Sequence, residues 1–258
     1  MSPMRQTEFR GQGWSVGWVD LPGRDPARVF LHGMGCLGGA IFGGVAGHPR
    51  LGGHRSVVVD LPGHGLSDRP ADWEYRLVDH ADAVAAVCAD AGVDGIDLVG
   101  HSLGGDIAVT LAGRHPGLVR RLVIAEANLD PIPPSPSGER TSQRIAAQTE
   151  EQFVATGYRE CLDTIPSWAP MLRLCDPRAV YRSAVGLVRG TRPTMREVFT
   201  GLGIPRTFIV GDAGEPLVDA AGLEASGVRV VTIAGAGHMM MTDQPEDFVG
   251  ALEAALPG

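Results

Sequence analysis

The sequence predicts an α/β protein built on a doubly wound, mostly parallel β-sheet. Short apolar runs rich in β-branched residues recur along the 258-residue chain, and each ends at a glycine or a polar residue. Near-continuous apolar runs of this length are typical of strands buried on both faces of a parallel sheet. Such strands are expected at residues 29–31, 57–59, 96–99, 122–124, 207–210 and 228–233.

Segments with apolar residues at helical spacing alternate with these strands, as expected for a doubly wound sheet. The predicted helices cover residues 78–91, 103–114 and 246–256. Pro245 precedes the last helix, and proline is favoured in the first turn of a helix. Near the start of the chain, residues 7–10 and 14–19 flank a Gly-Gln-Gly turn, which predicts an antiparallel hairpin on the edge of the sheet.

The segment of residues 131–203 contains no convincing strand and interrupts the alternation after the sixth strand, counting both strands of the hairpin. A proline-rich linker at residues 131–136 opens it. Helical patterns follow at residues 142–156, 157–165 and 177–189. Ligands of open α/β sheets bind at the carboxyl ends of the strands, so we expect a helical cap over that crevice. The predicted domains are a core of residues 1–130 and 204–258 and a cap of residues 131–203.

Composition narrows the classes of partner. The formal net charge is −8 with only 22 Lys and Arg residues, which argues against nucleic acid or an anionic membrane, because both select for basic patches. None of the four cysteines forms a Cys-x-x-Cys pair, so we expect no metal site. The first residues lack the apolar stretch of a secretory signal, and no run approaches the roughly 18 apolar residues of a membrane span. A cytoplasmic protein is expected, either a monomer or a homodimer.

The clearest chemical motif is Gly100-His101-Ser102-Leu103-Gly104, between a predicted strand and a predicted helix. A strand-to-helix turn this sharp needs small residues on both sides of its tip, and Gly100 and Gly104 provide that room. The turn then exposes the Ser102 hydroxyl in front of the amino end of a helix. The motif in this context predicts Ser102 as a nucleophile.

A second motif, His32-Gly33-Met34-Gly35, follows the strand at residues 29–31. A tetrahedral intermediate needs two backbone N–H donors directed at its oxyanion. We expect these donors to be the N–H groups of Leu103, beside the nucleophile, and Met34. The two glycines let the backbone approach the substrate, and we interpret Cys36 as a residue that lines the pocket rather than as a nucleophile.

A third motif, Gly235-Ala236-Gly237-His238, follows the last predicted strand. A serine hydroxyl is weakly acidic and needs an adjacent base. His238 lies late in the chain on a loop after a strand, which fits the order of nucleophile, acid and histidine. We therefore predict His238 as the general base and Met239, which follows it, as a pocket residue.

These three motifs, together with Asp60-Leu61-Pro62-Gly63-His64-Gly65-Leu66-Ser67, resemble the α/β-hydrolase superfamily, and its serine-nucleophile, esterase- and lactonase-like branch in particular. The similarity spans nearly the whole chain outside the cap. The resemblance implies that Asp60 and His64 shape a loop beside the site without taking part in the chemistry. It also implies an acidic residue that orients the histidine.

The position of this acid departs from the pattern of most relatives. They carry an Asp a few residues past the strand equivalent to 207–210, where this chain has Gly214; Asp212 comes too early and Glu215 one residue late. Glu126, at the end of the preceding predicted strand, is the favoured alternative. A buried charge there is costly unless it is paired, and certain haloalkane dehalogenases and fungal lactone hydrolases resemble this arrangement. Glu215 and Asp212 stay open as alternatives, and Asp130 is a weaker one.

The expected activity is hydrolysis of a carboxylic ester or lactone through an acyl-enzyme, without a cofactor or metal. Gly33, Cys36, Trp168 and Met239 are predicted to contact a small, apolar, ester-like substrate. The same residues also suit carbon–carbon bond hydrolysis of a diketone, thioester hydrolysis and amide or peptide cleavage, because fold and triad are shared across many chemistries. A non-catalytic receptor for a small ligand remains the alternative of another class.

Overall fold

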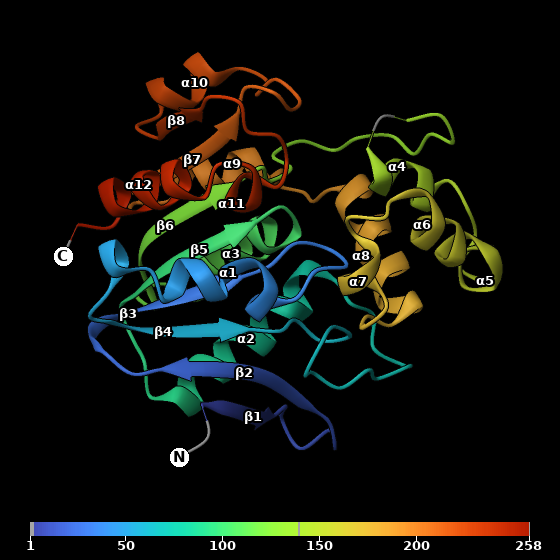
Figure 1. Ribbon diagram of the computed structural model, residues 1–258, viewed down its shortest axis with the longest axis horizontal. Helices are drawn as coiled ribbons and strands as arrows, with labels where there is room; N and C mark the ends of the chain where they lie inside the picture. Colours follow the sequence, from blue (N-terminus) through green and yellow to red (C-terminus); the bar gives the residue numbers. More distant parts are fainter. Residues whose placement is uncertain (1–2, 139, 258) are drawn as a thin grey trace.

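A central β-sheet organises the molecule (Figure 1). The computed structural model describes residues 3–138 and 140–257. The predicted domains also include residues 1, 2, 139 and 258, which lie outside the described residues. Eight strands pair in the order β1-β2-β4-β3-β5-β6-β7-β8. They are β1 (Met4–Glu8), β2 (Ser15–Leu21), β3 (Arg24–Leu31), β4 (His54–Val59), β5 (Ile96–His101), β6 (Val119–Ala125), β7 (Arg206–Gly211) and β8 (Arg229–Ile233).

The pairing confirms the predicted fold class. Strands β1 and β2 form the expected antiparallel hairpin at one edge, and β2 also runs antiparallel to β4. The five remaining pairings, from β4 through β8, are all parallel. The carboxyl ends of the parallel strands therefore meet at one edge of the sheet, the side on which the cap lies in Figure 1.

Helices cover both faces of the sheet. One face carries α2 (Leu77–Ala91), α3 (Leu103–Arg114) and α10 (Ala220–Ala225), and the other carries α1 (Gly38–Ala46), α11 (Met240–Asp243) and α12 (Pro245–Ala255). Helices α2, α3 and α12 match the predicted segments to within one residue at each end. The short helices α1, α10 and α11 were not predicted, because their glycine-rich or brief segments carry little helical periodicity.

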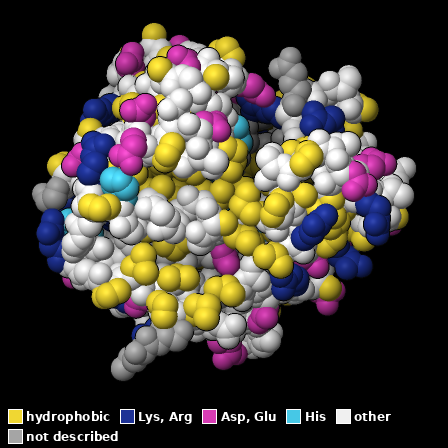
Figure 2. Space-filling view, in the orientation of Figure 1, with side chains coloured by type: hydrophobic (Ala, Val, Ile, Leu, Met, Phe, Trp, Pro, Cys, Tyr) yellow, Lys and Arg dark blue, Asp and Glu magenta, His cyan; other side chains and the backbone are white. Residues whose placement is uncertain are grey.

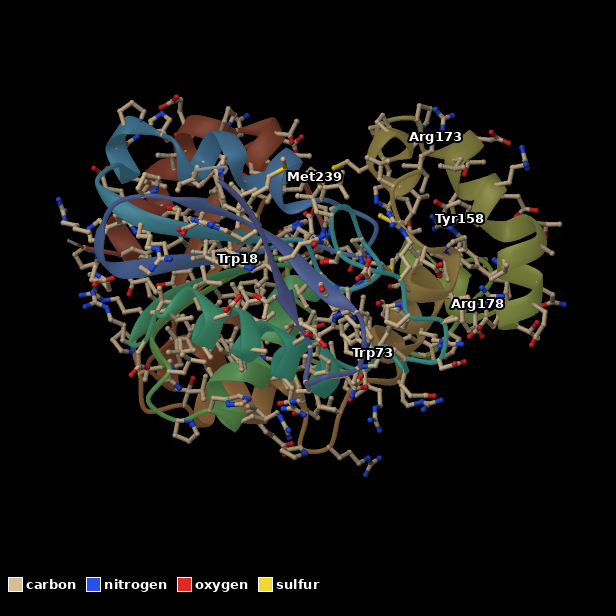
Figure 3. The ribbon with its side chains drawn as sticks, turned by 90° about the horizontal axis from the view of Figure 1, so that it is seen from below. Trp18, Trp73, Tyr158, Arg173, Arg178 and Met239 are labelled. Carbon is tan, nitrogen blue, oxygen red and sulfur yellow. The ribbon has the colours of Figure 1, made fainter. Side chains whose placement is uncertain are left out.

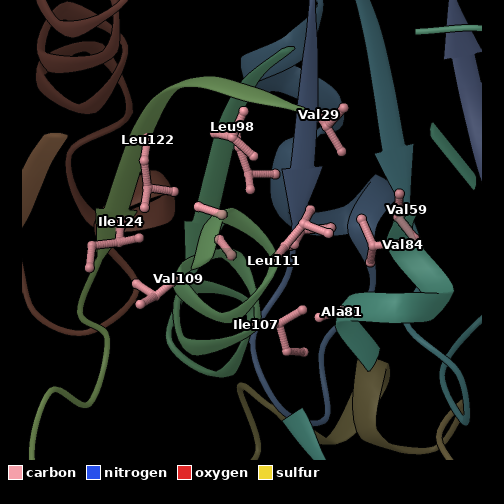
Figure 4. Close-up of a cluster of buried hydrophobic side chains, with 14 of the residues drawn as sticks. Val29, Val59, Ala81, Val84, Leu98, Ile107, Val109, Leu111, Leu122 and Ile124 are labelled. Carbon is pink, nitrogen blue, oxygen red and sulfur yellow. The ribbon is translucent and has the colours of Figure 1, made fainter. Parts of the chain in front are cut away.

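Side chains alternate between two cores along each buried strand. In β3, for example, Val29 and Leu31 join the cluster under α2 and α3, whereas Phe30 joins the cluster under α1 and α12. In β5, Leu98 and Val99 divide in the same way. Figure 4 shows the first cluster between the strands and helices α2 and α3. Burial on both faces explains why these strands are apolar at almost every position.

The segment between β6 and β7 is helical, as predicted for a cap, although the domain boundaries themselves stay a prediction. It contains α4 (Thr141–Ala146), α5 (Glu150–Gln152), a π-helical turn η2 (Phe153–Gly157), α6 (Tyr158–Thr164), α7 (Ala169–Leu172), α8 (Pro177–Arg189) and α9 (Met195–Gly201). A small apolar core holds α4, η2, α7 and α8 together. Tyr158, Arg173 and Arg178 lie on this unit, away from the sheet (Figure 3).

Backbone hydrogen bonds are among the contacts that tie the segment to the core. The Asp176 N–H donates to the Gly63 carbonyl at 2.8 Å, and the Gly65 N–H donates to the Leu174 carbonyl at 3.0 Å. Helix α9 packs against α3, and its Met195 and Phe199 join the larger core cluster, as does Leu187 of α8. The last part of residues 131–203 thus packs with the sheet. Within the described ranges, no helix is both long and apolar enough to span a membrane.

Candidate active site

Ser102 lies at a sharp turn between β5 and α3. Its backbone has φ 52° and ψ −122°, a conformation that costs energy for a residue other than glycine and is concentrated at functional sites. A Cβ on Gly100 would overlap the Gly104 backbone, and a Cβ on Gly104 would overlap the Leu31 carbonyl oxygen. Only glycine fits these two positions, so the motif is explained by close packing of the turn against β3.

The predicted oxyanion donors border this turn. Leu103 is the first residue of α3, so no earlier helical carbonyl can accept its N–H. On the facing loop, a Cβ at Gly33 would lie 3.2 Å from the Ser102 Cβ. Gly35 has φ +66° and donates its N–H to the His64 Nε2 at 3.2 Å. Met34, between them, lines the same cavity as Ser102.

Buried histidines brace this loop. The His32 Nε2 accepts the Leu61 N–H at 2.9 Å while its Nδ1 donates to the Gly33 carbonyl at 2.7 Å. Burial lowers the pKa of His32 to about 4 and that of His64 to about 3, so both rings are neutral. The Asp60 carboxylate accepts the N–H groups of Gly38 and Leu66. These contacts agree with structural roles for His32, Asp60 and His64.

Glu126 is the acidic residue that contacts His238. Its Oε2 lies 3.5 Å from the His238 Nδ1, and its side chain is only 8% exposed. Its Oε1 accepts the Gly211 N–H at 2.9 Å, while its own N–H donates to the Ile209 carbonyl. Like Ser102, Glu126 has a positive φ of 52°. Strand β7 thus holds the carboxylate on the imidazole from one side.

The alternative acids are engaged elsewhere. The Asp212 Oδ1 accepts the Gly235 N–H at 2.7 Å, which ties the loop before His238 to the end of β7. The Glu215 carboxylate pairs with Arg140, whose guanidinium also bonds to Asn128. Asp130 pairs with Arg196 at 2.7 Å. In the described residues, none of these three carboxylates has a hydrogen bond or ion pair with His238.

A cavity of about 1090 Å³ joins these groups. Its lining includes Ser102, Glu126 and His238 as well as all four residues predicted to contact substrate, which are Gly33, Cys36, Trp168 and Met239. Figure 2 shows the surface hollowed between the core and the cap, with hydrophobic side chains beside the hollow. Met239 lies at the boundary between these two parts (Figure 3).

Trp168 of the cap packs against the predicted oxyanion loop. The indole packs so closely on Gly35 that a Cβ there would overlap the ring. Cys36 is buried in the same contact, and burial raises the pKa of its thiol to about 12. A thiol so weakly acidic is not a nucleophile at neutral pH, in keeping with the interpretation of Cys36 as pocket lining.

Sequence reasoning missed three charged residues in the cavity lining, which are Asp243, after the His238 loop, and the arginines Arg140 and Arg196. The two arginines come from the segment between β6 and β7, where the sequence does not distinguish an arginine that enters the cavity from one on a solvent-exposed helix face. It also missed His101, which lines the cavity although its side chain is buried. The position of His101 directly before Ser102 in the serine motif was the signal that could have placed it beside the cavity.

Comparisons with known proteins agree with this fold. The family described as alpha/beta hydrolase fold matches residues 29–156. The chain is 31% identical over 271 residues to a pimeloyl-acyl-carrier-protein methyl ester esterase of Xanthomonas campestris, with 93% of this chain and 99% of that protein covered. It is 44% identical over 138 residues to a 2-hydroxymuconate semialdehyde hydrolase of Pseudomonas, over 53% of this chain and 42% of that protein.

A similar solved structure is an esterase from Exiguobacterium antarcticum, with a TM-score of 0.79 at 20% identity over 98% of both chains. At this identity the likeness concerns the fold alone. The chain belongs to the α/β-hydrolase family, and the relatives named above are esterases and hydrolases.

Proposed function

We propose that the protein is a serine hydrolase that cleaves a small, apolar carboxylic ester or lactone through an acyl-enzyme. One arrangement carries this proposal: Ser102 is held in a strained turn at the amino end of α3, in a cavity shared with the contacting pair His238 and Glu126. A nucleophile, a base and an acid that orients the base are the three groups of a serine triad for acyl transfer.

In the proposed mechanism, the His238 Nε2 removes the Ser102 proton as Oγ attacks the substrate carbonyl carbon. The N–H groups of Met34 and Leu103 stabilise the oxyanion. Glu126 keeps the imidazole proton on Nδ1 and stabilises the imidazolium. His238 then gives its proton to the departing alkoxide, and a water activated by His238 breaks the acyl–Oγ bond.

Among the described residues, no hydrogen bond joins the Ser102 hydroxyl to His238, and the acid–base contact of 3.5 Å is long. Catalytic hydrogen bonds are often long without substrate and shorten in the Michaelis complex. The proposal therefore includes a small approach of His238 toward Ser102 when substrate fills the cavity. The imidazole has room for it, because its side chain is 55% exposed.

The charges of the cavity favour an uncharged acyl group. Its two arginines, Arg140 and Arg196, are already paired with Glu215 and Asp130. Glu126 and Asp243 also line the cavity, so carboxylates outnumber guanidinium groups. An anionic substrate would meet a net negative lining, which disfavours it. Neutral esters and lactones avoid this cost.

Carbon–carbon bond hydrolysis is the second candidate. The observation that favours it is the 44% identity to the 2-hydroxymuconate semialdehyde hydrolase, higher than that to the methyl ester esterase but over about half of the chain. Thioester hydrolysis uses the same residues. Comparing turnover of p-nitrophenyl esters, lactones, acyl thioesters and a diketone separates these reactions.

The first test is intact-mass spectrometry after incubation with a fluorophosphonate, on wild type beside Ser102→Ala. The expected result is one adduct on the wild type and none on the variant. Turnover of an ester or lactone by the wild type alone would then support hydrolysis. Labelling without turnover, together with saturable ligand binding, would favour a receptor. Labelling of Ser102→Ala would refute the assignment of the nucleophile.

A further inference from the structure

His101 stands directly before Ser102 and is almost completely buried, at 1% exposure. The mechanism above does not use it. Its imidazole nevertheless lies between the two loops on which that mechanism depends. On one side, its Nδ1 faces Gly33, where an added Cβ would lie 3.0 Å away. On the other side it contacts His238.

The contact with His238 has two parts. The His101 Nε2 lies 2.8 Å from the His238 carbonyl oxygen, and the two rings pack with centroids 4.8 Å apart at an interplanar angle of 54°. A carbonyl only accepts, so the Nε2 of His101 carries the proton and donates it. The Nδ1 is left as an acceptor, and it has no partner among the described residues.

Few other contacts hold His238 in place within the part of the chain that the structure describes. Other hydrogen bonds fix the loop before it: Gly235 bonds to Asp212 and Gly237 bonds to Asp243. The imidazole itself is more than half exposed, and Glu126 contacts it at 3.5 Å on one edge. Among the described residues, the hydrogen bond from His101 joins the His238 backbone to the residue beside the nucleophile.

We propose that His101 is a positioning residue, which sets the distance between His238 and Ser102 through its hydrogen bond to the His238 carbonyl. This inference rests on the proposed function of Ser102 and His238. Because His101 and Ser102 are consecutive, the bond ties the base to the nucleophile turn across a single peptide unit. Burial lowers the pKa of His101 to about 3, so the ring stays neutral and its donor is retained across the working pH range.

Three substitutions separate the hydrogen bond from the volume of the ring. In His101→Gln, the amide nitrogen is the same number of bonds from Cβ as the His Nε2, so a donor can reach the His238 carbonyl. His101→Met has a similar reach and no N–H donor. His101→Asn places an amide at the level of Nδ1, too short to reach, and serves if the Met variant fails to fold. His80→Met is the matched control, because His80 is also fully buried and lies outside the cavity.

The assay measures kcat and KM for p-nitrophenyl butyrate, the rate of phosphonylation of Ser102 and the Tm of each variant. Loss of the donor should lower kcat about 10- to 100-fold with little change in KM. A loss of this size is expected when a residue that supports a catalytic group is removed, or when the catalytic group is displaced by about 1 Å. In His101→Gln, kcat should return to within about threefold of the wild-type value, because the strength of one hydrogen bond varies by about this much with its surroundings. His80→Met should lose stability and keep kcat.

Equal kcat values for the Gln, Met and Asn variants would overturn the proposal, as would losses that follow Tm in all variants including His80→Met. Failure of the proposed function looks different. In that case the wild type itself would neither react with the fluorophosphonate nor turn over ester, and both proposals would fall together. A reactive wild type with unaffected His101→Met and His101→Asn would refute the positioning role alone.

Discussion

Replacing Glu126 with glutamine removes one charge and leaves the shape of the side chain almost unchanged. The amide oxygen can still accept the Gly211 N–H, so the loop after β6 should keep its position. The amide nitrogen then faces the His238 Nδ1, where a carboxylate oxygen lay at 3.5 Å. Two donors cannot pair, so the imidazole must turn away or move its proton to Nε2, the atom that should accept from Ser102.

The size of the effect follows from the distance and the exposure. Two unit charges 3.5 Å apart attract by about 5 kcal/mol at an effective dielectric constant near 20. Because the imidazole is 55% exposed, water screens part of this attraction, and we expect about 3 kcal/mol. Loss of that stabilisation of the imidazolium in the transition state lowers kcat roughly 100-fold.

The assay compares kcat for p-nitrophenyl butyrate in Glu126→Gln and Glu215→Gln at pH 7.5, with far-UV circular dichroism to verify folding. Glu215 is the matched control, because its carboxylate pairs with Arg140 at the wall of the same cavity. Glu215→Gln should change kcat by no more than about threefold, because a partly exposed ion pair contributes little free energy. A large loss in Glu215→Gln with a mild one in Glu126→Gln would show that the acid has been misplaced, and equal mild losses would refute the reasoning altogether.

Two further predictions concern stability. Gly104→Ala places a methyl group on the Leu31 carbonyl oxygen, and overpacking of this kind should lower the free energy of unfolding by about 3 kcal/mol; Gly43→Ala in α1, where nothing lies within 4 Å, should leave it unchanged or raise it by up to about 1 kcal/mol. Urea denaturation checks both, and equal midpoints would contradict the steric argument. The second prediction concerns pH. His32, His64 and His101 have folded-state pKa values near 4, 3 and 3, below the ordinary 6.5, because burial disfavours the charged ring. The unfolded chain therefore binds more protons below pH 6.5, and stability should fall from there toward pH 4, by up to about 1.4 kcal/mol per pH unit for each histidine. Midpoints that stay constant between pH 6.5 and 4.5 would refute it.

Much of the fold could be predicted because it is encoded locally. Helix α8 begins at Pro177, after Asp176 caps its first turn, and ends at Arg189 before Gly190, so both boundaries are written in the sequence. The buried strands could be found because both of their faces are apolar. Helix α9 shows the limit of such reasoning. The sequence patterns predicted no helix at residues 195–201, and only the packing of α9 against α3 shows that this end of the inserted segment joins the core.

The site divides in the same way. Ser102 and His238 could be predicted because each lies in a short motif at the end of a strand, where a local rule places it. The acid could not be decided from spacing, because Glu126, Asp212 and Glu215 all follow strand ends. The tertiary structure separates them: parallel pairing of β6 and β7 brings the Glu126 carboxylate to the Gly211 N–H and the His238 ring.

The sequence by itself determined the strands, the turn that carries Ser102 and the loop that carries His238, because these depend on residues within a few positions of one another. The tertiary structure alone decided which carboxylate meets the imidazole, which arginines enter the cavity and that His101 bonds to the carbonyl of His238. Those contacts join residues as many as 137 positions apart. Their geometry is set by strand register and by the packing of loops, neither of which short-range patterns in the chain contain.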